Sequence, residues 1–189
     1  MAKKIVAFIG SPRKKGNTDT LVTELLAAAE KAGATTEKIY LSDLNIKPCN
    51  ACDSCHKKDP PQCVISDDDF AATADKMKAA DVVVFGTPVY WWTVSSQCKP
   101  FMDRWYGLLD SKWNSPFKGK SAAVVVCCQD SGTKAMTDPI VHTFRESFSF
   151  LGIDLVDTVT ATAHAKGEVA ENKKAMAKAA EVGRKLAAL

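Results

Sequence analysis

The sequence predicts an α/β fold in which helices cover both faces of a doubly wound sheet of five parallel strands. Two observations support this prediction. Short apolar runs alternate with segments of helical periodicity along the whole chain, and most of the runs are continuously apolar, as in strands buried on both faces. No linker or low-complexity tract interrupts the alternation, so the 189 residues are expected to form a single domain, 1–189. The predicted strands are 5–9, 38–41, 82–85, 122–127 and 153–159.

The segments between the strands supply the helices. The first helix repeats Leu21, Leu25 and Leu26 on one face and is expected to end at Gly33, which suits a left-handed cap. In the second, the three aspartates 67–69 stand where the helix dipole favours negative charge. Pro100 is either tolerated within the first turn or two of the third helix or moves the start of that helix later. The later helices are predicted at 66–80, 95–109, 139–151 and 168–189.

Two further expectations concern the strands. The third strand is expected to be broken at 86–88, which reads Gly-Thr-Pro. The fifth strand alternates in part between apolar and polar residues, which predicts an edge position.

A segment rich in cysteine, residues 49–63, follows the second strand and contains two prolines, so it is expected to be an insertion loop.

Charge and composition exclude several classes of function. The chain has 25 basic and 22 acidic residues, a formal net charge of +3, and its lysines and arginines are scattered, so no nucleic-acid partner is predicted. The first apolar run holds only five residues before Gly10, too few for a signal peptide or a membrane span. A cytoplasmic location is therefore expected, where seven cysteines are metal-binding, redox-active or buried more often than paired.

The loop 10–18 joins the end of the first strand to the start of the first helix, where free backbone N–H groups favour a phosphate. It is not a Walker loop, because five residues separate Gly10 from Gly16 and Asn17 stands where the lysine should be. Gly16 allows close backbone approach, and donors come from Ser11, Arg13, Asn17 and Thr18. The alternative is a solvated turn with Asn17 or Thr18 as its N-cap.

Sheet topology predicts a second wall for this anion site. In doubly wound sheets, ligands bind outside the carboxyl ends of the strands, where the strand order reverses. If the order is 2-1-3-4-5, the reversal lies between the first and third strands. The loops 10–18 and 87–93 then face one crevice.

Four motifs occur together in this chain: Gly10-Ser11-Pro12-Arg13, Gly16-Asn17-Thr18, Pro88-Val89-Tyr90, and Lys99, Phe101, Asp103 and Arg104. By these motifs the chain resembles the flavodoxin-like NAD(P)H-dependent FMN reductase and quinone reductase superfamily over roughly its first 135 residues. The resemblance implies an FMN phosphate bound by Ser11, Arg13, Gly16, Asn17 and Thr18. It implies an isoalloxazine ring lying against Pro88, Val89, Tyr90 and Trp91.

The third loop departs from the family pattern. Relatives carry a glycine-rich loop there, whereas this chain has one glycine, so contact of Ser131 and Gly132 with the pyrimidine edge of FMN is the least secure of the implied contacts. Lys99 and Asp103 are spaced for a helical salt bridge. No side chain is predicted to act as a catalytic acid or base. The resemblance also implies a homodimer or homotetramer, with the cysteine loop of one subunit near the flavin of another.

Cys49, Cys52, Cys55 and Cys63 form the pattern C-x₂-C-x₂-C-x₇-C. The first three have ferredoxin-like spacing and resemble those of the iron-sulfur flavoproteins of anaerobes, which implies a [4Fe–4S] cluster. Against a cluster, the last spacing is long and no proline follows Cys63. A zinc site and a site without metal remain open. The other cysteines are predicted to be buried small hydrophobes: Cys98, Cys127 and Cys128.

Together these features predict an FMN-binding oxidoreductase that passes electrons from NAD(P)H or a reduced carrier to a quinone, a flavin or a protein acceptor. Two alternatives remain. The first is a non-catalytic electron-transfer protein with FMN and a [4Fe–4S] cluster. The second is a flavin-free regulatory or metal-storage module.

Overall fold

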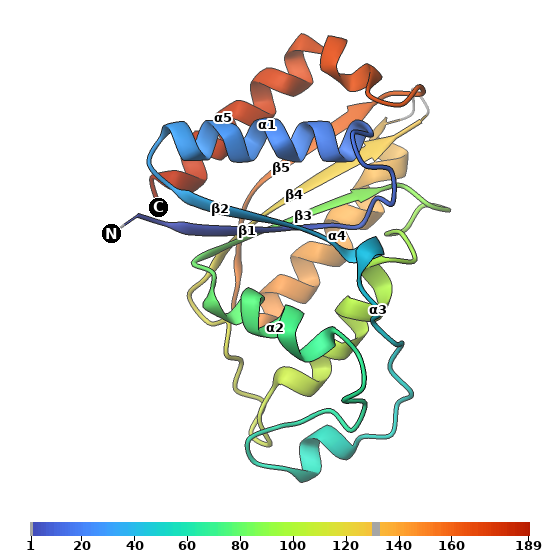
Figure 1. Cartoon of the computed structure of the whole chain (residues 1–189), viewed down its shortest axis with the longest axis vertical. Helices are drawn as coiled ribbons and strands as arrows, with labels where there is room; N and C mark the ends of the chain where they lie inside the picture. Colours follow the sequence, from blue (N-terminus) through green and yellow to red (C-terminus); the bar gives the residue numbers. More distant parts are fainter. Residues whose placement is uncertain (1, 130–132) are drawn as a thin grey trace.

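A computed structural model describes residues 2–129 and 133–189. Its five strands form one parallel sheet in the order β2-β1-β3-β4-β5, which confirms the predicted flavodoxin-like topology (Figure 1). β5 lies at one edge, as its partial alternation predicts. The strands are β1 (Lys4–Ile9), β2 (Thr35–Tyr40), β3 (Val82–Pro88), β4 (Ser121–Cys128) and β5 (Asp154–Thr162).

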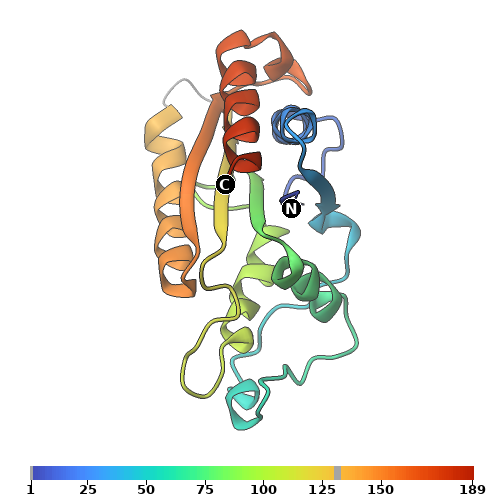
Figure 2. The ribbon, with the colours of Figure 1, turned by 90° about the vertical axis from the view of Figure 1, so that its left-hand side faces the viewer.

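The helices form a layer on each face of the sheet. α1 (Asn17–Lys31) and α5 (Lys173–Ala187) pack side by side on one face. The opposite face carries α2 (Phe70–Ala79), α3 (Cys98–Asp103) and α4 (Thr133–Leu151) (Figures 1 and 2). Short 3₁₀ turns are η1 (Leu41–Asp43), η2 (Ser54–Lys57), η3 (Arg104–Leu108) and η4 (Glu168–Glu171). None of the described helices is long and apolar enough to cross a membrane.

The two faces of the sheet are packed differently. On the face of α2, α3 and α4, stacked aromatic rings fill the core, and the centroids of Phe8 and Phe85 lie 5.0 Å apart. On the other face, small residues let α5 approach α1 closely. A Cβ added to Gly183 of α5 would lie 2.0 Å from the backbone oxygen of Leu25, so only glycine fits between these helices.

Several element boundaries differ from the predicted ones. β2 begins at Thr35 and ends at Tyr40, three residues earlier than expected at its start. β3 is not broken at Gly86 but continues to Pro88, which pairs with Cys127. A proline is tolerated there because it ends the strand, and the next N–H, from Val89, donates to the Cys127 oxygen at 3.0 Å.

The helices also differ at their ends. α3 begins at Cys98, so Pro100 falls within its first turn, and a 3₁₀ turn replaces it from Arg104. α4 begins at Thr133 rather than Pro139, so this proline lies inside the helix. α1 ends as predicted, since Gly33 has a φ of +96° just beyond the C-cap.

The cysteine loop, residues 49–63, follows β2 and η1 and lies below the sheet together with η3 and the segment 110–117 (Figure 1). Its one regular element is η2, so the prediction of an irregular loop is confirmed apart from that turn. The loop is therefore separate from the carboxyl edge of the sheet, which lies on the right in Figure 1.

Candidate functional site

The loop between β1 and α1 folds into a tight turn that ends at the N-cap residue Gly16. The N–H of Gly16 donates to the oxygen of Arg13 at 2.9 Å, and the N–H of Thr20 donates to the oxygen of Gly16 at 2.8 Å. A Cβ on Gly16 would lie 2.7 Å from the Arg13 oxygen, so only glycine fits. Since Gly16 has no side-chain oxygen, it leaves the N–H groups of the first turn of α1 available to an anion.

The buried carboxylate of Asp19 stabilises this loop through hydrogen bonds. Asp19, in the first turn of α1, accepts hydrogen bonds from the Lys15 N–H at 2.7 Å, from Lys38 Nζ at 2.7 Å and from the Tyr40 hydroxyl at 2.9 Å. Burial by itself raises the pKa of Asp19, but these donors outweigh it and hold the pKa below its usual value. The charged form thus holds Lys15, whose φ is +59°.

The end of β1 is joined directly to the segment after β3. Ser95 Oγ donates to the oxygen of Gly10 at 2.7 Å, and the N–H of Ser95 donates to Thr87 Oγ1 at 3.1 Å. A Cβ on Gly10 would lie 2.2 Å from the sulfur of Cys98. Glycine is therefore required at position 10 for the loop after β1 to approach the segment after β3.

A third segment, 163–169 after β5, is tied to the same loop by Asn17. Its side-chain Nδ2 donates to the oxygen of Ala165 at 2.9 Å, and its Oδ1 accepts the N–H of Val169 at 3.1 Å. Glu168 holds this segment in turn, because its carboxylate accepts the N–H groups of His164 and Ala165. The amide of Asn17 is thus used within the protein, and its backbone N–H is the group left for an anion.

These three segments line an open cleft at the carboxyl edge of the sheet, the place where doubly wound sheets bind their ligands. Eight residues singled out from the sequence line it: Ser11, Arg13, Gly16, Asn17, Thr18, Pro88, Val89 and Tyr90. Six others line it that sequence reasoning missed: Cys127, Cys128, Gln129, Ala163, His164 and Lys166. They lie at or just beyond the carboxyl ends of β4 and β5. The rule that located the first two loops could have found those at the end of β4, whereas the path of the chain after β5 depends on a contact between distant residues.

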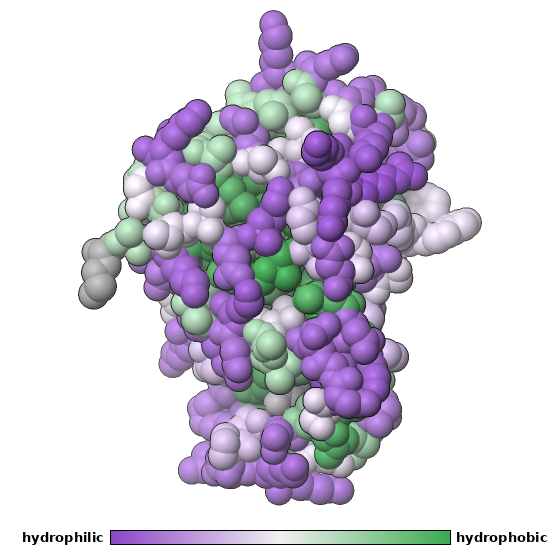
Figure 3. Space-filling view, viewed as in Figure 1, coloured by the Kyte–Doolittle hydropathy of each residue, from purple (hydrophilic) through white to green (hydrophobic). Residues whose placement is uncertain are grey.

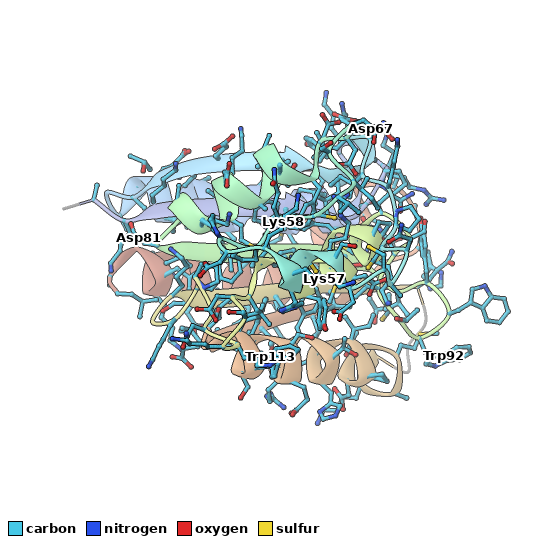
Figure 4. All side chains as sticks on the ribbon, turned by 90° about the horizontal axis from the view of Figure 1, so that it is seen from below. Lys57, Lys58, Asp67, Asp81, Trp92 and Trp113 are labelled. Atoms are coloured by element: carbon cyan, nitrogen blue, oxygen red, sulfur yellow. The ribbon has the colours of Figure 1, made fainter. Side chains whose placement is uncertain are left out.

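Trp91 is not among the described residues that line the cleft. Trp91 is 89% exposed at the tip of a two-residue turn, in which the N–H of Tyr90 donates to Thr93 and the N–H of Thr93 donates to Tyr90. Trp92 occupies the same tip and projects away from the body of the molecule (Figure 4). The implied contacts of Ser131 and Gly132 lie outside the described residues.

The cysteines of the sheet are buried, as predicted. Cys127 and Cys128 end β4, and Cys98 begins α3. Burial, followed by the neighbouring Cys128, raises the pKa of the Cys127 thiol to about 12, and burial raises that of Cys98 to about 11. Both thiols therefore stay protonated near neutral pH and are not nucleophiles.

Cys49, Cys52, Cys55 and Cys63 all line one pocket, closed on its other side by η3. In Figure 3, hydrophobic residues reach the surface at the lower end of the molecule, where this loop lies, among mainly hydrophilic surroundings. A Cβ on Gly107 of η3 would lie 3.5 Å from the sulfur of Cys55, so the turn passes close to the thiols. Within the described residues, no three Cys, His, Asp or Glu side chains converge as metal ligands.

Aromatic rings pack around Tyr106, which lines this pocket. The ring of His56 lies 4.4 Å from that of Tyr106 and 4.8 Å from that of Trp113, measured between centroids. The Tyr106 hydroxyl donates to Asp53 at 2.9 Å. Trp113 lies beside α4 in Figure 4, where its ring is 6.4 Å from Phe150.

The model of the family described as NADPH-dependent FMN reductase matches residues 3–180. The chain belongs to this family. An iron-sulfur flavoprotein of Methanocaldococcus jannaschii is 44% identical over 101 residues, which cover 53% of the chain and 51% of that relative. An iron-sulfur flavoprotein of Methanosarcina thermophila is 34% identical over 140 residues, 74% of the chain and 71% of the relative. The chain thus spans about half the length of the first of these relatives.

A solved structure supports the fold of this FMN reductase family member. The Trp repressor binding protein from Bacillus subtilis superposes with a TM-score of 0.72 at 24% identity, covering 94% of the chain and 99% of that protein. At this identity the likeness shows the fold alone. It agrees with the strand order described above.

The residues present fit the groups that the family implies. The glycine turn at Gly16, the free N-terminal N–H groups of α1 and the nearby Arg13 match the chemistry of a phosphate, as FMN carries. The four thiols of the second pocket have the donor chemistry of an iron–sulfur cluster, although within the described residues no three of them converge on one point.

Proposed function

We propose that this member of the FMN reductase family is an FMN-binding oxidoreductase that moves electrons from NAD(P)H or a reduced carrier to a quinone, a flavin or a protein acceptor. The observation that carries the proposal is the cleft, where the loops after β1 and β3 meet the ends of β4 and β5. Bound FMN would supply the electron-transfer chemistry. Ser11, Arg13 and the first turn of α1 would hold its phosphate, and Pro88, Val89 and Tyr90 would hold its ring.

Steady-state oxidation of NADH and NADPH tests the enzyme assignment. FMN-loaded protein is expected to oxidise at least one of them when a quinone is the acceptor. Absence of turnover with both nucleotides, in protein shown to contain FMN, would contradict the reductase assignment and favour electron transfer between protein carriers.

The four thiols favour a second candidate, a non-catalytic electron-transfer protein that carries FMN and a [4Fe–4S] cluster. Two observations support it: all four cysteines line one pocket, and the two relatives described above are named iron-sulfur flavoproteins. Anaerobically purified protein should then contain about four irons per chain and absorb broadly near 400 nm. Flavin without iron after anaerobic reconstitution would exclude the cluster.

Replacing Cys63 with serine tests the ligand set directly. Removal of one thiolate from a four-thiol site is expected to lower bound iron by at least about tenfold, because hydroxyl is a poor ligand for a cluster. FMN content should not change, since Cys63 lines the second pocket and not the cleft. Cys98→Ser, a buried cysteine outside that pocket, is the matched control, and equal iron loss in both variants would contradict the assignment.

We further propose that the chain assembles as a homodimer or homotetramer. Trp91 and Trp92 expose 89% and 52% of their surface at one tip beside the cleft, and apolar surface of this kind is commonly covered in an assembly. Sedimentation velocity measures the assembly, and a monomer at micromolar concentration would contradict it.

A further inference from the structure

The two ends of the cysteine loop meet at one buried side chain, Arg104, the first residue of η3. Its Nη1 donates to the backbone oxygen of Lys47, before the first cysteine, at 3.3 Å. Its Nη2 donates to the backbone oxygen of Ile65, beyond the last cysteine, at 2.8 Å. One guanidinium group therefore binds both ends of the segment that carries all four thiols.

Asp68 completes the arrangement. It forms an ion pair with Arg104, and both side chains are 1% exposed. Its carboxylate also accepts the N–H of Lys47 at 2.9 Å and the N–H of Phe70 at 3.2 Å. Burial by itself raises the pKa of Asp68, but the Lys47 N–H and Arg104 outweigh it and keep the pKa below its usual value.

The neighbouring aspartates act on the same end of the loop. Asp67 pairs with Lys47 Nζ at 2.5 Å, and Asp69 accepts the N–H of Asn45 at 2.7 Å. The helix α2 begins at Phe70 with Asp69 as its N-cap, so the expected start at residue 66 is wrong, although the three aspartates do precede the positive end of the helix. Their carboxylates connect the incoming and outgoing ends of the loop.

The geometry is specific to arginine. The guanidinium group lies 4.0 Å from the centroid of the Phe70 ring, while its two terminal nitrogens reach three oxygens on the two segments that flank the loop. A lysine ammonium is a point charge and cannot hold this fork. Arg104 also borders the cysteine pocket, and within the described residues its Nε–H has no hydrogen-bond partner, which leaves one donor for an acceptor such as a thiolate.

We propose that Arg104 and Asp68 form a clamp that closes the base of the cysteine loop and positions its four thiols for metal binding. The proposal rests on the four-thiol candidate described above. Bringing the ends of a flexible loop together costs conformational entropy. Because the clamp joins the loop ends when the chain folds, this entropy is not lost again when the metal binds, and metal affinity is higher. The two residues are positioning residues, because neither is a thiol ligand.

Titration of the reduced apoprotein with Co²⁺ under anaerobic conditions tests the clamp. Arg104→Lys and the isosteric Asp68→Asn are each expected to weaken Co²⁺ affinity about 10–100-fold, as loss of supporting groups does at other metal sites. The cobalt–thiolate absorption should fall as fewer thiolates bind each ion. FMN affinity should stay within about twofold, because neither residue lines the cleft.

Lys99→Met is the matched control, since it removes an exposed salt bridge to Asp103 one turn earlier in the same segment. It should leave Co²⁺ affinity unchanged. Wild-type affinity in both Arg104→Lys and Asp68→Asn would overturn the clamp. If one variant does not fold by circular dichroism, the other decides.

Limited proteolysis separates failure of the clamp from failure of the four-thiol candidate. If the wild-type protein binds neither Co²⁺ nor iron, the four-thiol candidate fails and metal positioning by the clamp fails with it. The rate of proteolytic cleavage within 48–64 then tests whether the clamp holds the loop closed. Cleavage should be at least about tenfold faster in Arg104→Lys than in wild type and Lys99→Met. Equal cleavage rates would overturn the closure as well.

Discussion

Replacing Gly16 with valine is expected to weaken FMN binding by at least about 100-fold. The new side chain would meet the Arg13 oxygen at 2.7 Å and the Arg13 Cβ at 2.9 Å, so the turn has to open. Opening it moves Arg13 and the first-turn N–H groups of α1 from the phosphate. Two charge-assisted hydrogen bonds are worth about 1.5–3 kcal/mol each, and 1.4 kcal/mol corresponds to tenfold in affinity. Quenching of flavin fluorescence by the apoprotein measures the dissociation constant.

Gly33→Ala is the control for this prediction. Gly33 lies just past the other end of α1, and no atom lies within 4 Å of an added Cβ, although its φ of +96° disfavours alanine. This variant should lose some stability while it binds FMN normally. If Gly16→Val binds FMN as tightly as Gly33→Ala does, the phosphate is not held at this turn.

Replacing Gly183 with alanine is expected to lower the free energy of unfolding by about 3 kcal/mol, at the upper end of the usual cost of overpacking. The added Cβ would lie 2.0 Å from the Leu25 oxygen, 2.9 Å from the Leu25 carbonyl carbon and 3.2 Å from the Ala28 Cβ. Two of these atoms are backbone, so α5 has to move away from α1. Urea unfolding followed by circular dichroism measures the change.

Whether Gly183→Ala lowers or raises the free energy of unfolding tests how closely α5 packs against α1. At an exposed helix position, glycine to alanine stabilises by about 1 kcal/mol, because alanine has the higher helix propensity. Ala177→Gly, on the solvent side of α5, provides the control and should cost about that amount. A Gly183→Ala protein more stable than wild type would show that the two helices are further apart in solution.

The cleft could be predicted because its parts obey a local rule and a topological rule. A strand end, a glycine turn and a helix start are all visible within 10–18, and parallel strands place their carboxyl ends at one edge. The same rule did not lead us to His164 and Lys166, since the path of the chain after β5 depends on the bond between Asn17 and Ala165. That bond joins residues 148 positions apart.

Boundaries were predicted less well where tertiary contacts override local preference. Glycine and proline commonly interrupt strands, yet β3 continues through Gly86 and ends only at Pro88, because β4 pairs with it along its whole length. Pro139 would start a helix by propensity, yet α4 begins at Thr133 and packs against β4 and β5. In both cases the free energy gained by packing in the sheet or against it outweighs the cost of placing glycine or proline inside a regular element, which is about 1–3 kcal/mol.

The sequence by itself determined the family fold, the glycine turn between β1 and α1 and the presence of four closely spaced cysteines, since each depends on residues near one another in the chain. Only the tertiary structure decided what holds the cysteine loop. Asp68 and Arg104 are 36 positions apart, and in the sequence they belong to an acidic helix start and to a motif of the third helix. Folding buries both, and a buried charge requires a partner, so the pair and the two loop ends that it joins become visible only in three dimensions.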